Sequence, residues 1–169
     1  MTKLGYGIIA AAGLAATAAL TAQEALFNRP AEVTAIMAGG RMYPGTYKAS
    51  QMARVCGETD PAQFVTGERT FLIEFPLDDD PEITDLRFDS KELVRGATTT
   101  TKFYVSVTVK AKNGGRPPAY FVDTARPTPG DSGRASLKVA GGTVELTVTA
   151  ADSLGQTLNL TVVCRPRRP

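Results

Sequence analysis

The chain of 169 residues contains no histidine and no tryptophan, and it has only two cysteines. Without histidine, there is no base for a Ser–His or Cys–His nucleophile and no histidine-ligated zinc or copper site. Two cysteines without a C-x-x-C motif leave no thiolate metal site and no redox dithiol. The absence of tryptophan removes an aromatic platform of the kind that sugar sites use. The sequence therefore predicts a protein that is not an enzyme and that carries no cofactor.

Charge is also nearly balanced. The 19 lysines and arginines exceed the 17 aspartates and glutamates by two, so the formal net charge is +2. An excess this small does not indicate a nucleic-acid partner. Hydrophobic residues make up 43% and charged residues 21% of the chain, which is typical of a globular domain.

The N-terminus resembles an export signal. Lys3 precedes an alanine-rich apolar run, and small residues end this run at Ala22. This layout predicts a secretory signal peptide over residues 1–22 and a single domain over residues 23–169. The alternative is a retained membrane anchor, because residues 6–22 approach the length of a short membrane-spanning helix. Both interpretations place the domain outside the cytoplasm, periplasmic or secreted if the leader is cleaved and membrane-anchored if it is retained.

The predicted export bears on the oxidation state of the two cysteines. Cysteines of exported domains usually pair, so Cys56 and Cys164 are predicted to form a disulfide. Cys164 shares its alternating row with Leu158, Leu160 and Val162, which places it on the apolar face of a final strand.

The remainder of the chain alternates between apolar and polar residues, which is typical of half-buried β-strands. The clearest inward rows are Phe71, Ile73, Phe75; Phe103, Val105, Val107, Val109; Ala135, Leu137, Val139; and Val144, Leu146, Val148. Weaker candidates cover residues 32–37, 46–50, 83–88 and 119–124. Gly141-Gly142 between two such rows predicts a tight hairpin turn. Seven to nine short strands with regular turns predict an antiparallel, immunoglobulin-like β-sandwich preceded by an apolar helix.

One tetrapeptide is similar to the nucleophile segment of chymotrypsin-like serine proteases. It is Gly130-Asp131-Ser132-Gly133, and Arg134 follows where that family has another glycine. The histidine that would accept the serine proton is absent from the chain, so the tetrapeptide is predicted to be a turn.

Acidic residues are concentrated in one segment, at Asp78, Asp79, Asp80, Glu82, Asp85 and Asp89. Calcium binds to clusters of carboxylates on bent loops, although this spacing does not match the EF-hand loop. The alternative is a solvated acidic loop that discourages edge-to-edge strand pairing.

Two features could contact a partner. Tyr104 should point away from the Phe103 row, and one of Tyr120 and Phe121 should face outward; of that pair, Tyr120 is taken as the candidate contact. The tail adds Arg165, Arg167 and Arg168, which could dock on an acidic surface. We therefore expect a non-catalytic interaction or structural module with a protein partner, such as an accessory subunit of a membrane-associated complex. The alternative is a secreted ligand- or calcium-binding domain.

Overall fold

The computed structural model describes residues 26–39, 44–60, 68–76, 82–111 and 118–167. Within these residues the regular structure is entirely β, and no helix is long and apolar enough to cross a membrane. The predicted leader helix over residues 1–22 lies outside the described residues. The strands are β1 (Phe27–Ala38), β2 (Gly45–Thr59), β3 (Thr70–Glu74), β4 (Ile83–Ser90), β5 (Thr99–Thr100), β6 (Tyr104–Val109), β7 (Ala119–Asp123), β8 (Ser132–Ala140), β9 (Thr143–Ala151) and β10 (Thr157–Cys164).

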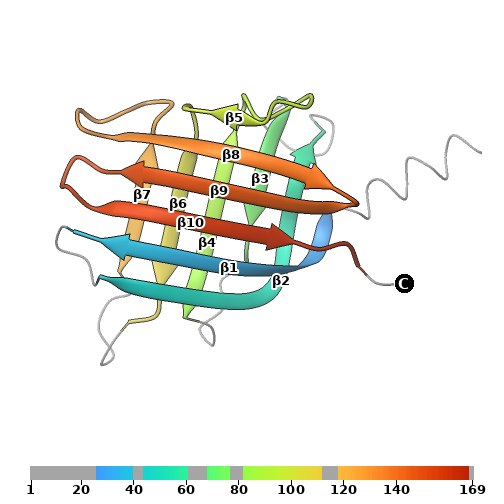
Figure 1. Ribbon diagram of the computed structural model, residues 1–169, viewed down its shortest axis with the longest axis horizontal. Helices are drawn as coiled ribbons and strands as arrows, with labels where there is room; N and C mark the ends of the chain where they lie inside the picture. The colour runs from blue at the N-terminus through green and yellow to red at the C-terminus, as the bar shows by residue number, and fades with distance from the viewer. Residues whose placement is uncertain (1–25, 40–43, 61–67, 77–81, 112–117, 168–169) are drawn as a thin grey trace, which may run out of the picture.

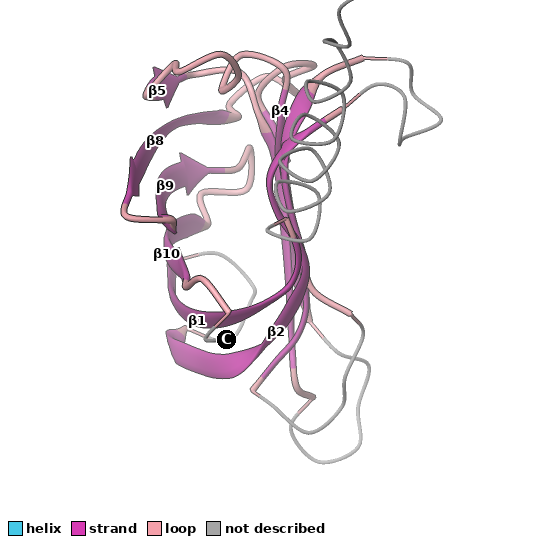
Figure 2. Ribbon diagram, turned by 90° about the vertical axis from the view of Figure 1, so that its right-hand side faces the viewer, coloured by secondary structure: helices cyan, strands magenta, loops and turns pink. Residues whose placement is uncertain are grey.

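All ten strands belong to one antiparallel sheet with the order β5-β8-β9-β10-β1-β2-β3-β4-β6-β7. The sheet bends into a half-barrel with two facing layers. Figure 1 shows β8, β9, β10 and β1 crossing in front of β7, β6, β4 and β3 at a steep angle, and Figure 2 shows the two layers in profile. The prediction of an all-β antiparallel fold is therefore confirmed.

Strand β2 carries the sheet from one layer to the other. Its first part pairs with β1 as far as Val55, and its last part, from Val55 to Thr59, pairs with β3. Gly57, with φ of 154°, sits at this corner, and a Cβ atom there would lie 2.4 Å from Leu26 Cδ2. On the neighbouring strand Asn28 has φ of 51°, a left-handed conformation that asparagine tolerates better than most residues. A small residue and an asparagine thus allow both strands to turn the corner.

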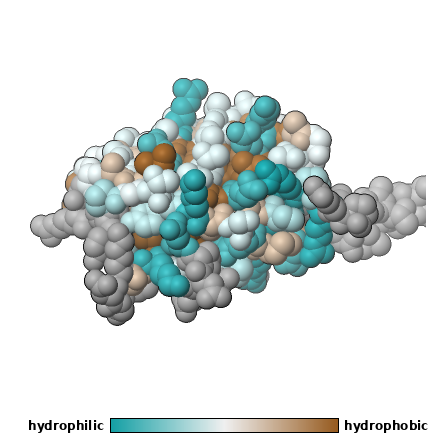
Figure 3. All heavy atoms as spheres, turned by 60° about the horizontal axis from the view of Figure 1, so that its bottom comes forward, coloured by the Kyte–Doolittle hydropathy of each residue, from teal (hydrophilic) through white to brown (hydrophobic). Residues whose placement is uncertain are grey.

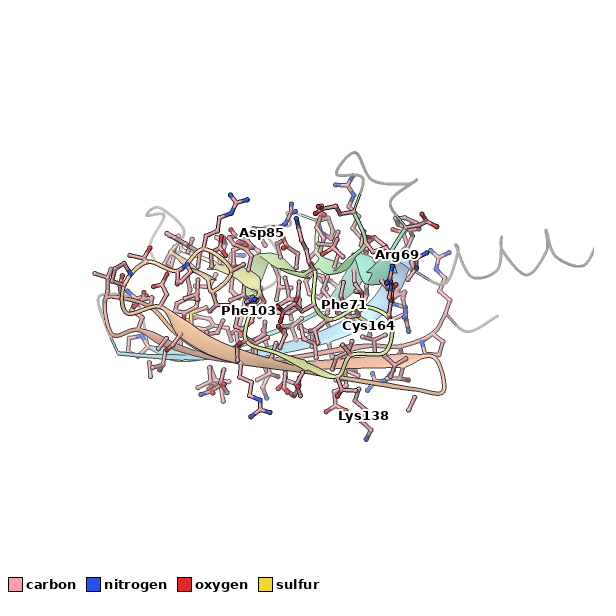
Figure 4. The ribbon with its side chains drawn as sticks, turned by 90° about the horizontal axis from the view of Figure 1, so that it is seen from above. Arg69, Phe71, Asp85, Phe103, Lys138 and Cys164 are labelled. Atoms are coloured by element: carbon pink, nitrogen blue, oxygen red, sulfur yellow. A yellow bond between two sulfur atoms is a disulfide. The ribbon has the colours of Figure 1, made fainter. Side chains whose placement is uncertain are left out.

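The core lies between the layers, where the alternating rows meet. The row from Phe103 to Val109 is at most 1% exposed, and Val144, Leu146 and Val148 are at most 4% exposed. The rings of Phe88 and Phe103 stack with centroids 5.6 Å apart. Figure 4 shows Phe71, Phe103 and Cys164 between the layers and Lys138 on the outside. These inward rows are confirmed.

Gly141 and Gly142 form the two-residue turn between β8 and β9, as predicted. Their φ angles are 56° and 76°, and the strands pair up to Ala140 and Thr143 on either side. Positive φ at both central positions is what a tight primed turn requires, and glycine adopts it without steric strain.

The disulfide between Cys56 and Cys164 is present. The two Cα atoms are 6.6 Å apart, although the cysteines are separated by 108 positions in the sequence. The bond ties the end of β10 to β2 at the corner and passes beside β1, the strand that separates them in the sheet. A disulfide of this kind fits an oxidising environment outside the cytoplasm.

Several details of the sequence-based prediction are wrong, including the strand number, which is ten among the described residues rather than seven to nine. Strand β2 has 15 residues, whereas the alternation predicted residues 46–50 only, and the two-residue strand β5 was not predicted. Val139 was predicted to be buried with Ala135, but it is 63% exposed. Val139 lies near the end of β8 and lines a cavity there.

Candidate functional site

A cavity of about 730 Å³ lies at the end of the half-barrel that holds the disulfide. We call it the end cavity. Its apolar lining comes from Leu26, Phe71, Leu93, Ala97, Leu137, Val139 and Val144. Cavities that bind small molecules are typically lined mainly by apolar side chains with a few polar groups, and their volumes range from roughly 300 to 1,000 Å³. The end cavity matches this description in both size and lining.

The end cavity is lined by segments from both layers of the sheet. On one side the β8–β9 hairpin carries Leu137, Val139 and Val144, and on the other side β3 contributes Phe71. The segment from Leu93 to Thr98, which leads from β4 to β5, covers the remaining side. Apolar residues that the alternation assigns to the core thus line a space between the layers.

Arg29 is the principal polar side chain of the end cavity. It is only 6% exposed, and its guanidinium donates hydrogen bonds to four backbone carbonyls at the corner. Nε donates to Arg165 O at 3.2 Å, Nη1 to Cys56 O at 3.3 Å, and Nη2 to Cys164 O at 3.3 Å and to Gly142 O. A single side chain therefore connects β1 to the ends of β2 and β10 and to the β8–β9 turn.

The charge of Arg29 is not matched by a carboxylate. Among the described residues, none of the ion pairs includes Arg29. Burial lowers the pKa of its guanidinium, which nevertheless stays protonated because the ordinary pKa of arginine is so high. Carbonyl dipoles satisfy the N–H groups, but they do not cancel a full positive charge.

Among the described residues, two further charged side chains line the end cavity, Glu58 and Arg167. The Glu58 carboxylate is already engaged, because it lies 3.1 Å from Arg69 Nη1 and accepts the backbone N–H of Arg95 at 2.9 Å. Arg167 donates through Nε to Asn28 O at 2.9 Å. The cavity wall thus carries an excess of positive charge.

The arginine tail is held against the body of the protein. The Arg165 guanidinium forms a bidentate pair with the Glu32 carboxylate, and the pair lowers the pKa of Glu32. The Arg165 backbone N–H donates to Pro30 O at 2.8 Å, which extends the β10–β1 ladder. Of the three predicted tail residues, Arg167 lines the end cavity, Arg165 anchors the chain beside it, and Arg168 lies outside the described residues.

The prediction that Tyr120 faces a partner is wrong. Tyr120 is 1% exposed, whereas Phe121 is 67% exposed. Neighbouring residues of a strand point to opposite faces, and here the larger phenol was turned inward. Burial raises the pKa of the Tyr120 hydroxyl, with the charges of Asp152 and Asp131 contributing in the same direction.

Tyr104 is half-buried and lines a second hollow, of about 620 Å³, on the outer side of β4 and β6. The walls of this hollow carry charges of both signs. Arg87 lies 3.3 Å from Asp89, and Lys102 lies 3.2 Å from Glu92. Because these charges pair with each other, the second hollow has less unpaired charge with which to bind a ligand than the end cavity has.

The described part of the acidic segment does not converge. Glu82 accepts the backbone N–H of Lys48 at 2.8 Å, Asp89 pairs with Arg87, and Asp85 faces the outer side of β4. Among the described residues, no three histidine, cysteine or acidic side chains could hold a metal ion together. Asp78, Asp79 and Asp80, on which the calcium hypothesis mainly depends, lie outside the described residues. The prediction of a turn over Gly130–Gly133 is correct only for its first half, where Asp131 accepts the backbone N–H groups of Thr128 and Ser153, because Ser132 and Gly133 begin β8.

Asp85→Asn should stabilise the fold modestly at neutral pH. Burial raises the pKa of the Asp85 carboxyl, and the charge of Glu74 raises it further. A carboxyl with a raised pKa supports folding below its unfolded pKa and loses that contribution as the pH rises through its folded pKa. Because the group is only partly buried, the expected gain at pH 7 is about 0.5 kcal/mol.

Urea unfolding of both proteins from pH 3 to pH 7 would test this prediction. The stability difference should grow as the pH rises and vanish at the acidic end. Asp123→Asn is the matched control, because Asp123 accepts the backbone N–H groups of Ala125 and Arg126 through Oδ1, an acceptor that asparagine retains, so this variant should stay close to the wild type in stability. A constant difference at every pH would show that the Asp85 charge is not the cause.

Sequence reasoning missed Arg29 and the end cavity altogether. Arg29 lies between the predicted leader and the first strand, where an arginine is usually solvated. The alternation assigned Val139 to the row of Ala135, but it could not show that Val139 lines a cavity and is largely exposed.

Comparison of the chain with family models, with curated proteins and with solved structures finds no match. The end cavity and its two arginines are therefore the features from which a function is inferred.

Proposed function

We propose that this protein is an extracytoplasmic, non-catalytic module that binds an apolar or amphipathic small molecule in the end cavity. The observation that carries this proposal is the cavity itself, about 730 Å³ in volume with a mainly apolar lining. Burial of apolar ligand surface against such a wall would supply most of the affinity, at about 25 cal/mol per Å². The disulfide beside the cavity supports a location outside the cytoplasm.

A module that contacts a protein partner has weaker support. The large exposed apolar side chains, Ile36, Met52, Phe121, Val139 and Leu154, lie on different strands and loops rather than in one patch. Figure 3 shows hydrophilic side chains spread between small apolar areas on the face that it presents. Protein interfaces usually centre on a contiguous patch with aromatic anchors, and Phe121 is the strongest anchor in this set.

The immunoglobulin-like class also stays a proposal. Two facing antiparallel layers and a disulfide inside the fold support it. The unbroken ladder from β10 through β1 and β2 to β3 is instead the feature that makes the sheet a half-barrel.

Binding of the neutral dye N-phenyl-1-naphthylamine would test the proposed function. Its fluorescence should rise on addition of the protein and saturate at one site. Ala97→Phe should weaken the binding at least about tenfold, because Ala97 lines the cavity and a phenyl group would occupy the space that the dye needs.

Ala119→Phe is the matched control. Ala119 is exposed on β7, so this variant adds the same side chain without touching the cavity and should bind the dye like the wild type. No saturable binding by the wild type, or equal binding by both variants, would contradict the proposed function.

A further inference from the structure

We infer that the ligand of the end cavity is an anionic amphiphile, whose acidic head group binds Arg29 and Arg167 while its apolar chain fills the rest of the cavity. This inference rests on the proposed function, and it adds the chemical class of the ligand and the residues that select it.

The first support is the remaining donor capacity of Arg29. A guanidinium has five N–H groups, and four of them are used by the carbonyls of Arg165, Cys56, Cys164 and Gly142. One hydrogen on Nη1 is left, on a side chain that lines the cavity and is 6% exposed. The four carbonyls also fix the orientation of the group, so little conformational entropy would be lost when a ligand binds.

The second support is the balance of charge around the cavity. Arg29 and Arg167 contribute two positive charges, and Glu58 contributes one negative charge. Arg69, at 3.1 Å, already neutralises Glu58. An anion at the corner would thus meet an excess of positive charge, and its attraction to the buried Arg29 would be stronger than the same attraction in water.

The third support is the distribution of polarity along the cavity. The arginines lie at the disulfide end, beside Cys56 and Gly142, whereas Leu93, Ala97 and Leu137 provide apolar surface elsewhere. A molecule with an acidic group at one end and a hydrocarbon chain at the other fits this polarity. A guanidinium binds carboxylates and phosphates alike, so the shared chemistry of the head group is an oxyanion.

The test is displacement of the bound neutral dye from the wild-type protein by ligands that share one chain and differ in head group. Decanoate, decyl phosphate, decanol and decyltrimethylammonium would be compared below their aggregation concentrations. The concentration of decanoate or decyl phosphate that displaces half of the dye should be at least about tenfold lower than that of decanol. A hydrogen bond to a charged group in a partly buried site contributes affinity of this size. The cation should be the weakest. The stronger of the two anions identifies the head group.

Equal displacement by decanoate, decyl phosphate and decanol would overturn the anionic class while leaving the apolar site intact. Absence of saturable dye binding would instead overturn the proposed function, and this inference with it. The two failures are thus distinguishable.

Arg167→Gln separates the two arginines. This variant should bind the preferred anion about threefold more weakly, because Arg167 is exposed and its charge is screened, and it should lose less affinity for decanol than for the anion. The preference for the anion that remains in Arg167→Gln measures the contribution of Arg29. Arg29 itself, which holds the corner together, therefore does not have to be substituted. Arg134→Gln, at an exposed position of β8, is the control and should change neither affinity. Complete loss of the preference in Arg167→Gln would overturn the role of Arg29.

Discussion

Cys164→Ser should lower the free energy of unfolding by about 2–4 kcal/mol. The disulfide closes a loop in which the cysteines are 108 positions apart, so its removal releases a large part of the unfolded chain. The entropy estimate for so long a loop is about 4–5 kcal/mol, and measured gains are often smaller. Both cysteines are fully buried at the corner of the sheet, so the serine hydroxyl also enters apolar surroundings.

Urea unfolding with and without reductant would measure this effect. The wild type in reductant should lose about the same stability as the variant in its absence. The variant should then show no further loss when reductant is added, which separates the missing bond from any local disturbance by serine. Unchanged unfolding midpoints in all four conditions would show that the bond does not stabilise the fold.

The same experiment bears on the end cavity. Cys56 lines the cavity, and Cys164 provides one of the carbonyls that hold Arg29. Reduction should therefore weaken dye binding and lower the free energy of unfolding. A destabilising substitution in a distant part of the core should lower the free energy of unfolding without weakening dye binding. Leu158→Ala is a suitable comparison, since Leu158 is buried on β10 near the opposite end of the strand and does not line the cavity.

The sequence was informative where one rule governs the structure. Alternation identified the inward rows of β3, β6, β9 and β10, because residues two apart on a strand share a face. The glycine pair identified the β8–β9 turn, because few residues adopt positive φ at two successive positions. The disulfide followed from the number of cysteines together with the predicted export signal.

Alternation was less informative where the structure depends on distant parts of the chain. It assigns a residue to a face but does not show what covers that face, which is why the exposed Val139 was predicted to be buried. It also did not show that β2 continues through Cys56 and Gly57, since the turning of the corner interrupts the regular pattern. Arg29 was missed because its partners are carbonyls of residues 27 to 136 positions away.

Arg29→Met should destabilise the fold by about 2–4 kcal/mol. Replacement of a buried charge by an apolar side chain of similar length is neutral or stabilising in some proteins, because the charge no longer has to be desolvated. That outcome requires the partner groups to be replaced as well. Here the partners are backbone carbonyls, which stay in place, and those of Cys56 and Cys164 would lose a charged donor at a buried corner.

Arg54→Met is the matched control. The Arg54 side chain lies on the neighbouring strand β2, is 68% exposed and pairs with Glu74 at 3.1 Å, so its replacement should change the stability by less than about 1 kcal/mol. Equal stability of Arg29→Met and the wild type would mean that the gain from avoided desolvation matches the lost hydrogen bonds.

A double-mutant cycle with Cys164→Ser gives the sharper test. Arg29 and the disulfide act at the same corner, because Arg29 connects β1 to the ends of β2 and β10, and the disulfide links those two ends to each other. If removal of either the arginine or the disulfide opens the corner, the second substitution should lower the free energy of unfolding by less than it does in the wild type. The interaction energy should then be about 1 kcal/mol or more. Strict additivity would show instead that the arginine and the disulfide stabilise the corner independently, and that reduction alone does not release the arginine from the wall of the end cavity.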